Sequence, residues 1–282
     1  MKRLWRIGGQ EHDLSQGGMV MGIVNVTPDS FSDGGRFLDA SRAVEHALRL
    51  VSEGAHILDI GGESTRPGAE PVDEAEELRR VLPVIRAVRS QTRTLISIDT
   101  MKANVARAAL DAGADIINDV TGLRGDPAML RFAADCQAGI VIMHMIGNPQ
   151  TMQKQPHYDD VVGEVREFFA TRLRTLEHEG IAPERVVLDP GFGFGKTLAH
   201  NIALLKSLRE LGVNDRPILV GVSRKSMLGR LLDSDVLEDR DWPTVALTSQ
   251  VREAGAHIVR VHEVRPNVEA LRMTEAILGV SA

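Results

Sequence analysis

Residues 19–35 read MVMGIVNVTPDSFSDGG, an apolar run followed by a long polar loop. The run Met19–Val24 has the length and character of a buried strand. The apolar pattern stops after it, because Pro28 fixes one backbone angle and the Asp and Ser side chains compete for backbone hydrogen bonds. A doubly wound sheet commonly carries a glycine-rich nucleotide-binding turn at this place. The polar loop found here favours a barrel, in which it is either an active-site lid or an ordinary surface excursion.

The alternation of strand and helix continues along the whole chain. Short β-branched runs predict eight strands, at Val20–Thr27, His56–Ile60, Leu95–Thr100, Asp115–Val120, Gly139–Met145, Val186–Asp189, Pro217–Ser223 and His257–His262. Amphipathic stretches between them predict helices at Ser41–Glu53, Asp73–Ser90, Lys102–Ala112, Pro127–Cys136, Asp160–Gly180, Asn201–Leu211, Lys225–Leu232, Pro243–Ala254 and Asn267–Leu278. Eight strand-helix units are typical of a (β/α)8 TIM barrel. We predict an α/β barrel that forms a single domain over residues 1–282.

A short motif recurs at three joints between a helix and the next strand. It reads Gly54-Ala-His-Ile57, Gly113-Ala-Asp-Ile116 and Gly255-Ala-His-Ile258. Glycine suits the left-handed position just past a helix end, so the repeat has a local cause and does not require gene duplication. A doubly wound open sheet remains the alternative, because it uses the same alternation, commonly with fewer strands.

The composition excludes several classes of protein. The chain has 282 residues, of which 43% are hydrophobic, enough for a sizeable core. A single cysteine, Cys136, excludes an internal disulfide, and the start lacks the apolar region of a secretory signal, so we expect a cytoplasmic protein. No apolar run approaches the roughly 18 to 20 residues of a membrane span. The net charge of −6 argues against a general nucleic-acid binder and leaves small molecules as the expected partners.

Polar residues gather where the predicted strands end. In a barrel, these strand ends and the loops that follow them carry the active site. Every strand contributes, in chain order through Asn25, Glu63, Ser64, Thr65, Arg66, Asp99, Asn118, Asp119, His144, Asp189, Ser223, Arg224, Lys225, Arg260 and His262. Residues two apart on a strand face the same side, so we expect Arg260 and His262 to project together.

Several of these residues also have a structural interpretation. Asp99 precedes a predicted helix, and a role as its cap is nearly as expected as a functional one. We favour structural roles for Asp119 and for His144, which resembles a buried core histidine. Asp189 precedes Pro190, which disfavours a simple cap, and the next helix starts about ten residues later, so a functional role is favoured.

The segment DPGFGFGKT, residues 189–197, has the appearance of a phosphate-binding loop. It fails that template because Pro190 occupies the position of the first glycine, and the pattern G-x-G-x-x-G is also absent. We expect the glycines to bring the backbone close to a flat ligand, with Phe192 or Phe194 as an aromatic face. The segment SRKS, residues 223–226, either binds an anion at a helix start or is a solvated basic helix start.

The candidate site therefore has two chemical halves. Asp99, Asn118 and Asp189 offer oxygen atoms that suit a neutral ring rich in N–H donors. The cations suit phosphates, and they are Arg66, Lys225, Arg260 and His262. A polar heterocycle that carries a phosphate tail fits both halves.

Seven motifs, in order along the whole chain, resemble those of the dihydropteroate synthases. They lie at Asn25–Gly35, Gly61–Gly68, Ile98–Thr100, Asn118–Val120, Asp189–Lys196, Ser223–Ser226 and Arg260–His262. One position departs from the family, because Glu263 stands where Asp is usual.

The resemblance implies a transferase of folate synthesis. Members of the family condense 6-hydroxymethyl-7,8-dihydropterin pyrophosphate with 4-aminobenzoate, which gives 7,8-dihydropteroate and pyrophosphate. The resemblance also implies Mg²⁺ as the cofactor and a homodimer formed through outer helices late in the chain.

Site residues carry over from the family motif by motif. The pterin ring would be bound by Asp99, Asn118, Asp189 and Lys225. The pyrophosphate would be held by Thr65, Arg66, Arg260 and His262. The 4-aminobenzoate would be bordered by Phe31, Pro67, Phe194 and Ser226. Asn25 would reach the metal, and the catalytic set would be Asp99, Lys225, Arg260 and His262.

The chemistry of the family agrees with these residues. Departure of pyrophosphate leaves a positive charge on the pterin methylene group, which a buried Asp99 would stabilise. We expect His262 to bind the pyrophosphate as a cation. We interpret Asn25–Gly35 as a lid over the pyrophosphate, with Phe31 shielding the aminobenzoate.

Two other functions are considered. A barrel that passes a methyl group from a folate to a corrinoid shares the ring-binding residues, but it has no reason to carry the anion cluster. A non-catalytic pterin-binding barrel would be expected to lose Asn25, Lys225 or His262, and all three are present. The synthase is the predicted function.

Overall fold

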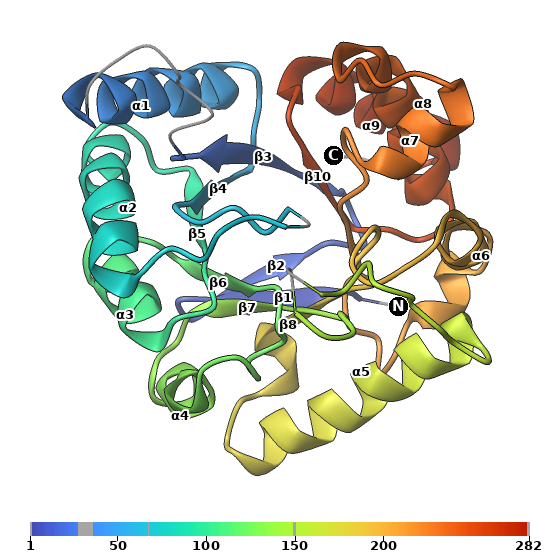
Figure 1. Cartoon of the computed structure of the whole chain (residues 1–282), viewed down its shortest axis with the longest axis horizontal. Coiled ribbons are helices and arrows are strands. Elements are labelled where there is room, and N and C mark those ends of the chain that lie inside the picture. The colour runs from blue at the N-terminus through green and yellow to red at the C-terminus, as the bar shows by residue number, and fades with distance from the viewer. Residues whose placement is uncertain (1, 28–35, 67, 149–150, 281–282) are drawn as a thin grey trace.

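The chain forms a ring of eight parallel strands surrounded by helices (Figure 1). The computed structural model describes residues 2–27, 36–66, 68–148 and 151–280. The barrel strands are β3 (Met19–Asn25), β4 (Ile57–Gly61), β5 (Leu95–Asp99), β6 (Ile116–Asp119), β7 (Gly139–Met143), β8 (Val186–Asp189), β9 (Leu219–Val220) and β10 (Ile258–Val261). They pair in the order β8-β7-β6-β5-β4-β3-β10-β9, and a bridge between Leu188 and Ile218 joins the two ends. The predicted barrel is confirmed, and the open sheet is wrong.

Helices cover the outside of the barrel. They are α1 (Arg36–Ser52), α2 (Glu74–Arg89), α3 (Ala103–Asp111), α4 (Pro127–Asp135), α5 (Val161–His178), α6 (Leu198–Lys206), α7 (Ser226–Leu232), α8 (Asp241–Glu253) and α9 (Val264–Leu278), with 3₁₀ turns η2 (Pro183–Arg185), η3 (Leu208–Leu211) and η4 (Glu238–Arg240). The predicted helix Asn201–Leu211 is wrong at both ends. Thr197 caps an earlier start with its side chain, and the helix gives way to η3 after Ser207.

The predicted strand Pro217–Ser223 is much shorter in the structure. Only Leu219–Val220 forms regular strand pairing, as β9. Proline has no N–H to donate to a ladder, which limits pairing at the start of the segment. The shortened strand still places the segment SRKS directly after the barrel.

Two apolar layers make up most of the core, and a third, small cluster contains Val120, Met143, Met145, Met152 and Phe194. The larger layer lies between the outer faces of the strands and the helices. The smaller layer fills one end of the barrel interior and contains Met21, Ile57, Ile116, Val141, Val187, Leu219 and Ile258. Because side chains alternate along a strand, these residues are the inward-facing positions near the strand starts.

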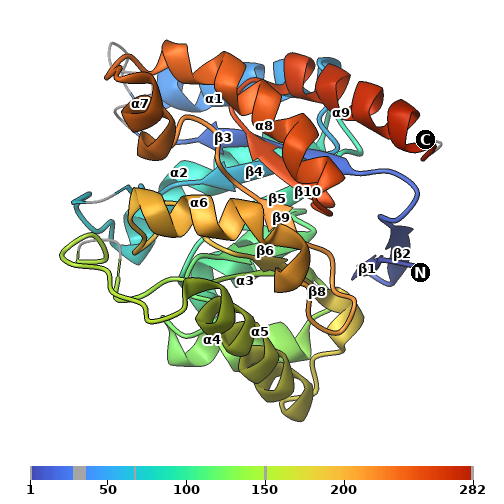
Figure 2. The same ribbon diagram turned by 90° about the vertical axis from the view of Figure 1, so that its right-hand side faces the viewer.

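A hairpin that the sequence analysis did not predict closes this end of the barrel. It pairs β1 (Leu4–Ile7) with β2 (Gln10–Asp13), and Figure 2 shows it at one end of the molecule. Trp5 is fully buried in the smaller apolar layer, and its Nε1 donates a hydrogen bond of 2.9 Å to the carbonyl of Arg185. The hairpin therefore forms a floor beneath the barrel interior.

Further along the strands, the inward-facing positions become polar. Asp59 and Ser97 are completely buried, and Asn118 and Asp189 are 5% and 7% exposed. These side chains stand between the apolar floor and the loops at the carboxyl ends of the strands. The open end of the barrel is therefore the polar end.

Candidate active site

The structure brings the predicted residues to the carboxyl ends of the strands. Asn25, Asp99 and Asp189 are the last residues of β3, β5 and β8. The others on or after strands are Thr65 and Arg66 in the β4–α2 loop, Asn118 in β6, Phe194 in the β8–α6 loop, Lys225 and Ser226 at the start of α7, Arg260 in β10, and His262 just after it. Phe31, Pro67 and residues 28–35 of the predicted lid lie outside the described residues.

Arg260 connects two carboxylates inside the barrel. Its Nε donates to Oδ2 of Asp59 at 2.6 Å, and its Nη2 donates to Oδ2 of Asp99 at 3.0 Å. Asn118 also donates to Oδ2 of Asp59, at 3.1 Å. These contacts join residues from β4, β5, β6 and β10 into one network.

Asp59 was not among the site residues predicted from the sequence. The residue stands within the otherwise apolar strand ILDIG, where it was counted as part of a buried run. A signal was present, because the Asp59 carboxylate shares the inward face of the strand with Ile57 and lies four positions before Glu63 in the loop that follows. An ionisable residue inside an apolar strand is rarely left without a partner.

Asp99 has an unusual electrostatic environment. Burial raises the pKa of its carboxyl group to about 7, and the neighbouring Asp59 carboxylate adds to the increase, while Arg260 opposes it. Asp99 does not cap the following helix. The first N–H of α3, on Ala103, is bound instead by Asp126 at 2.8 Å. The capping interpretation of Asp99 is therefore wrong.

Asp119 has the structural role that we predicted. Its carboxylate accepts hydrogen bonds from the backbone N–H and the hydroxyl of Thr121, both at 2.7 Å, and from the N–H of Leu123 at 3.1 Å. Leu123 has a φ of 60°, a left-handed conformation that is unfavourable for leucine. Asp119 thus holds a strained turn after β6.

Lys225 lies over the ring of Phe194. Its Nζ is 4.1 Å from the ring centroid, a cation–π distance. Burial lowers the pKa of Lys225 to about 8, and Arg260 adds to this effect. Burial also raises the pKa of Asp189 to about 6, although the N–H of Gly191 donates to its carboxylate at 2.7 Å. Phe192, in contrast, is 1% exposed within the larger apolar layer, so Phe194 is the aromatic residue at the site.

The glycine-rich β8–α6 loop is held by Lys196. Its Nζ donates to the carbonyls of His144, Gly191 and Phe194 at 3.0 to 3.2 Å, and it contacts Nδ1 of His144 at 3.0 Å. A Cβ atom on Gly191 would lie 2.1 Å from the His144 carbonyl, so only glycine fits this approach. The structural role predicted for His144 is confirmed.

His262 differs from the expectation for a cationic residue. Its Nδ1 contacts the hydroxyl of Ser223 at 2.9 Å, and that oxygen also accepts from the His262 N–H at 3.2 Å. Burial lowers the pKa of His262 to about 3, and the cations Arg224, Arg260, Lys225 and Arg66 lower it further. The imidazole is therefore neutral at pH 7 in the free protein, which does not favour the expected cation, although that expectation concerns the pyrophosphate complex and stays a prediction. With the hydroxyl donating to Nδ1, the ring proton is on Nε2.

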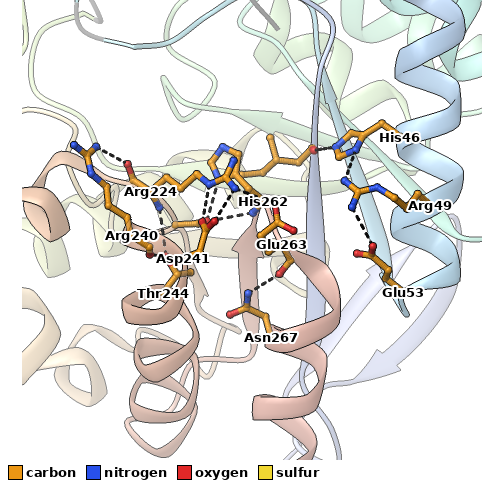
Figure 3. A network of polar contacts seen from close by, with 12 residues as sticks. His46, Arg49, Glu53, Arg224, Arg240, Asp241, Thr244, His262, Glu263 and Asn267 are labelled. Atoms are coloured by element: carbon orange, nitrogen blue, oxygen red, sulfur yellow. Dashed lines mark hydrogen bonds and ion pairs between the residues drawn. The ribbon is translucent and has the colours of Figure 1, made fainter. Parts of the chain in front are cut away.

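The turn before α7 depends on two acidic residues (Figure 3). Arg224 has a φ of 55°, and its guanidinium bonds both oxygens of Asp241 at 2.7 and 2.9 Å. The same guanidinium reaches Oε1 of Glu263 at 2.9 Å. The departure at position 263 thus keeps a carboxylate, now on a longer side chain, as a partner of Arg224. These bonds fix the turn that points the chain toward Lys225.

The β4–α2 loop is anchored by an ion cluster. Nζ of Lys102 contacts Oε2 of Glu63, in the loop, and Oε2 of Glu77 at 2.5 Å, in α2. Glu77 is completely buried, which makes the loss of its partner costly. Because Glu63 is two residues before Thr65, the cluster sets the position of the loop at that point.

A cleft of about 970 Å³ opens beside these residues. It is lined by parts of the loops after β4, β5, β6 and β7, including the strand-end residues Glu63, Ser64 and His144, but by none of the residues assigned to the pterin, the pyrophosphate, the aminobenzoate or the metal. Its cations are already paired, since Lys102 binds two carboxylates and Arg124 lies 4.8 Å from the ring of Phe168. The charge needed for a phosphate ligand therefore lies inside the barrel mouth and not in this cleft.

The described residues would fit a magnesium ion only if substrate and water supplied most of its ligands. Among the described residues, no group of three or more His, Cys, Asp or Glu side chains could hold a metal. Mg²⁺ commonly uses one or two protein oxygens together with phosphate oxygens and water. The half-buried amide of Asn25, at the end of β3, would supply an oxygen ligand of this kind.

Comparisons with known proteins agree with this arrangement. A family model described as pterin binding enzyme matches residues 21–262. The dihydropteroate synthase of Escherichia coli K12 is 49% identical over 260 residues, which cover 92% of each protein. The structure of Xanthomonas albilineans dihydropteroate synthase with 4-aminobenzoic acid matches with a TM-score of 0.92 and 46% identity, over 99% of this chain and 100% of that chain. Burkholderia cenocepacia dihydropteroate synthase, complexed with 7,8-dihydropteroate, matches with a TM-score of 0.88 and 44% identity, over 99% and 97% of the two chains.

Proposed function

The chain belongs to the pterin-binding enzymes and, among them, to the dihydropteroate synthases, and on this premise we propose how its residues share the reaction. The enzyme condenses 6-hydroxymethyl-7,8-dihydropterin pyrophosphate with 4-aminobenzoate. The C–O bond to pyrophosphate breaks, a C–N bond to the aromatic amine forms, and one proton is released from the amine nitrogen. The methyl-transferring barrel and the non-catalytic barrel are set aside, because the relatives named above are synthases.

The pterin ring binds against the carboxylate and amide wall. Asp99, Asn118 and Asp189 present acceptors for the N–H groups of the ring, and each is on or at the end of a strand. Lys225, at the start of α7, adds a donor. Support comes from burial, since strand-borne side chains with little exposure are rigid enough to select one ring edge.

The pyrophosphate binds against Thr65, Arg66, Arg260 and His262. Arg66 is exposed on its loop, and its charge contributes to the lowered pKa of His262, which supports a role for this loop near the same cluster. A neutral His262 donates a hydrogen bond from Nε2, while the guanidinium groups carry the positive charge. Mg²⁺, held through Asn25, would supply further charge neutralisation of the leaving pyrophosphate.

The reaction centre lies where the two halves meet. The observation that carries this assignment is the 3.0 Å contact between Arg260 and Asp99, which joins the phosphate half to the ring half. As the C–O bond breaks, positive charge develops on the ring and its methylene group. The ionised carboxylate of Asp99 stabilises this charge in a site with little water. No nucleophile from the protein is required.

The 4-aminobenzoate binds beyond the pterin, next to Phe194 and Ser226. Phe194 is buried beneath Lys225, and Ser226 is exposed at the first position of α7. Phe31 and Pro67 complete this pocket in our proposal, with residues 25–35 as the lid. The amine nitrogen then approaches the methylene group from the face opposite the pyrophosphate.

Pyrophosphate release from the pterin substrate is the test of this function. The purified protein is assayed with Mg²⁺, with and without 4-aminobenzoate, and the products are analysed by mass. We expect dihydropteroate to form only when both substrates are present. Pterin binding without release or product would indicate a binding protein, and absence of pterin binding would refute the assignment of the ring site.

We also propose a homodimer built on α7, α8 and α9. Large apolar side chains are exposed there, namely Leu231, Leu232, Trp242, Met273 and Ile277, with 45% to 77% exposure. Figure 2 shows α8 and α9 side by side on this face. Contiguous exposed apolar surface is typical of a subunit interface. Sedimentation at several concentrations is expected to show a dimer, and Met273→Glu is expected to shift it toward the monomer.

Further proposals concern the organisation and location of the chain. No helix among the described residues is long and apolar enough to span a membrane. We keep the cytoplasm as the proposed location, supported by the single cysteine. We also keep a single domain over residues 1–282, supported by the packing of the N-terminal hairpin into the barrel.

A further inference from the structure

Asp59 is a buried carboxylate with no role in the assignments above. It lies in the middle of β4, has no exposed surface, and has apolar neighbours on both sides along the strand. Burial of an ionised carboxylate costs several kcal/mol unless cations and donors compensate. The residue lies in the polar part of the barrel interior, and its partners there are side chains of the candidate site.

One oxygen of Asp59 serves two of those side chains. Oδ2 accepts from Nε of Arg260 at 2.6 Å and from Nδ2 of Asn118 at 3.1 Å. Arg260 belongs to the proposed pyrophosphate half and Asn118 to the ring half. Asp59 therefore contacts both halves of the site from below.

The contact with Asp59 also limits how Arg260 binds Asp99. A guanidinium that faces a single carboxylate commonly binds it through two nitrogens. Here Nε is occupied by Asp59, and Nη2 reaches Asp99 at 3.0 Å. Without Asp59, Arg260 would be free to close on Asp99, the carboxylate that must face the developing positive charge.

The second oxygen of Asp59 also has a polar side chain next to it. Among the described residues, Oδ1 of Asp59 and the hydroxyl of Ser97 are both buried without a hydrogen-bond partner. The two residues are paired in register across β4 and β5. Two such atoms side by side suit one shared ordered water, which would hold the carboxylate in its orientation.

We propose that Asp59 is a positioning residue, which orients Arg260 and Asn118 for the pterin pyrophosphate and does not itself contact the substrate. The inference rests on the proposed roles of those two residues. The proposal differs from a purely structural role for this buried carboxylate. Loss of a purely structural residue would not raise the KM for one substrate and leave the KM for the other unchanged.

The variant Asp59→Asn tests the proposal. It keeps the shape of the side chain but removes the charge that holds the guanidinium. We expect the KM for the pterin pyrophosphate to rise at least about 10-fold and kcat to fall, with the KM for 4-aminobenzoate within about twofold of wild type. The matched control is Asp115→Asn, which removes the 2.6 Å partner of Arg89 away from the site. The control is expected to change the thermal stability and leave both KM values unchanged.

Each other outcome is also decisive. If Asp59→Asn folds and both KM values stay at the wild-type level, Asp59 does not position the site. If Asp59→Asn does not fold, Asp59→Ser replaces it, and failure of both to fold would mark Asp59 as a folding residue and overturn the inference. The variants Arg260→Gln and Asn118→Ala are measured in parallel. If they leave the KM for the pterin pyrophosphate unchanged while wild type makes dihydropteroate, the assignment of those residues is wrong, and the inference fails with it.

Discussion

Asp99 titrates near the pH at which the enzyme is expected to work. Burial and Asp59 raise the pKa of its carboxyl group to about 7, so the carboxylate is present above that pH and is lost as the pH falls through it. The proposed mechanism needs the ionised form. The residues that surround Asp99 in the fold therefore set how much of the enzyme carries the ionised carboxylate, and with it the reaction rate at a given pH.

We expect kcat/KM for the pterin pyrophosphate to fall as the pH is lowered through about 7, the pKa of Asp99. The variant Asp99→Asn should lose at least about 100-fold in kcat, because it removes a preorganised charge at the developing cation. It should also lose this part of the pH profile. An acid limb that persists unchanged in the variant would show that another group is titrating.

The neutral state of His262 gives a second prediction. Because its pKa is lowered to about 3, its charge is constant well above that pH. We compare inhibition by pyrophosphate in wild type and in His262→Gln from about pH 5.5 to 8, the range around the ordinary histidine pKa. The ratio of the two inhibition constants should stay constant, since the titration of pyrophosphate itself cancels. If the inhibition constant of His262→Gln divided by that of wild type rises toward low pH, His262 binds pyrophosphate as a cation.

Sequence patterns located the residues at strand ends but not their states. The position of Asp99 follows from the period of a strand, whereas its pKa depends on Asp59 and Arg260, which come from other strands. The charge of His262 likewise depends on cations that only the fold brings together. Asp59 itself was hidden because a single charge does not disturb the apolar pattern of a short strand.

At the scale of elements, the turn before α7 stores strain that ion pairs hold in place. The left-handed backbone of Arg224 costs on the order of 1 kcal/mol or more. Asp241 binds its guanidinium through two hydrogen bonds, and Glu263 through one. The start of α7 is thus positioned by side chains of α8 and of the residue before α9.

The variant Asp241→Ala should release this turn. We expect the KM for 4-aminobenzoate to rise about 10-fold, because Lys225 and Ser226 move with the backbone. Glu263→Asp is the control, since it removes at most one of the three bonds and leaves the family's usual residue, and it should stay within about twofold of wild type. Equal effects of the two variants on this KM would contradict the assignment.

The ion cluster that anchors the β4–α2 loop gives another prediction. In Lys102→Met, Glu63 and the buried Glu77 lose their shared cation. We expect lower thermal stability and a KM for the pterin pyrophosphate about 10-fold higher, because the loop that carries Thr65 shifts. Lys206→Met, at an exposed position of α6, serves as the control. If both variants have the same KM, the cluster does not position the loop.

The elements themselves were predictable where the apolar pattern is strong. The eight barrel strands lie within the predicted ranges, apart from Met19 at the start of β3 and Gly61 at the end of β4, because these strands consist mainly of buried β-branched residues. The hairpin was missed because its second strand, QEHD, is polar and short. The hairpin is held by Trp5, which packs into the barrel interior, and that interior exists only once the barrel has closed.

At the scale of the whole molecule, the barrel is divided into an apolar floor and a polar mouth. Every predicted site residue that the structure describes lies at the mouth. The floor is completed by the hairpin, whose Trp5 packs with Met21, Val141 and Leu219. Stability and chemistry are thereby placed at opposite ends of the same strands, as in other barrels of this class.

Trp5→Ala should therefore separate stability from catalysis. We expect the free energy of unfolding to fall by about 3 to 5 kcal/mol, the usual loss for a large buried aromatic side chain. Both KM values should stay unchanged at a temperature where the variant is folded. Glu11→Ala, exposed in the same hairpin, should change the free energy by less than about 0.5 kcal/mol. A large change in either KM would mean that the floor influences the mouth.

The hairpin also affects the order in which the chain can fold during its synthesis. Residues 4–13 are translated before all eight barrel strands, but the side chain of Trp5 binds the carbonyl of Arg185, and Arg3 pairs with Asp215 at 2.6 Å. The hairpin therefore cannot complete these contacts until Arg185 and Asp215 have been translated. The hairpin therefore docks late, and this end of the barrel interior is closed only after most of the barrel strands have been translated.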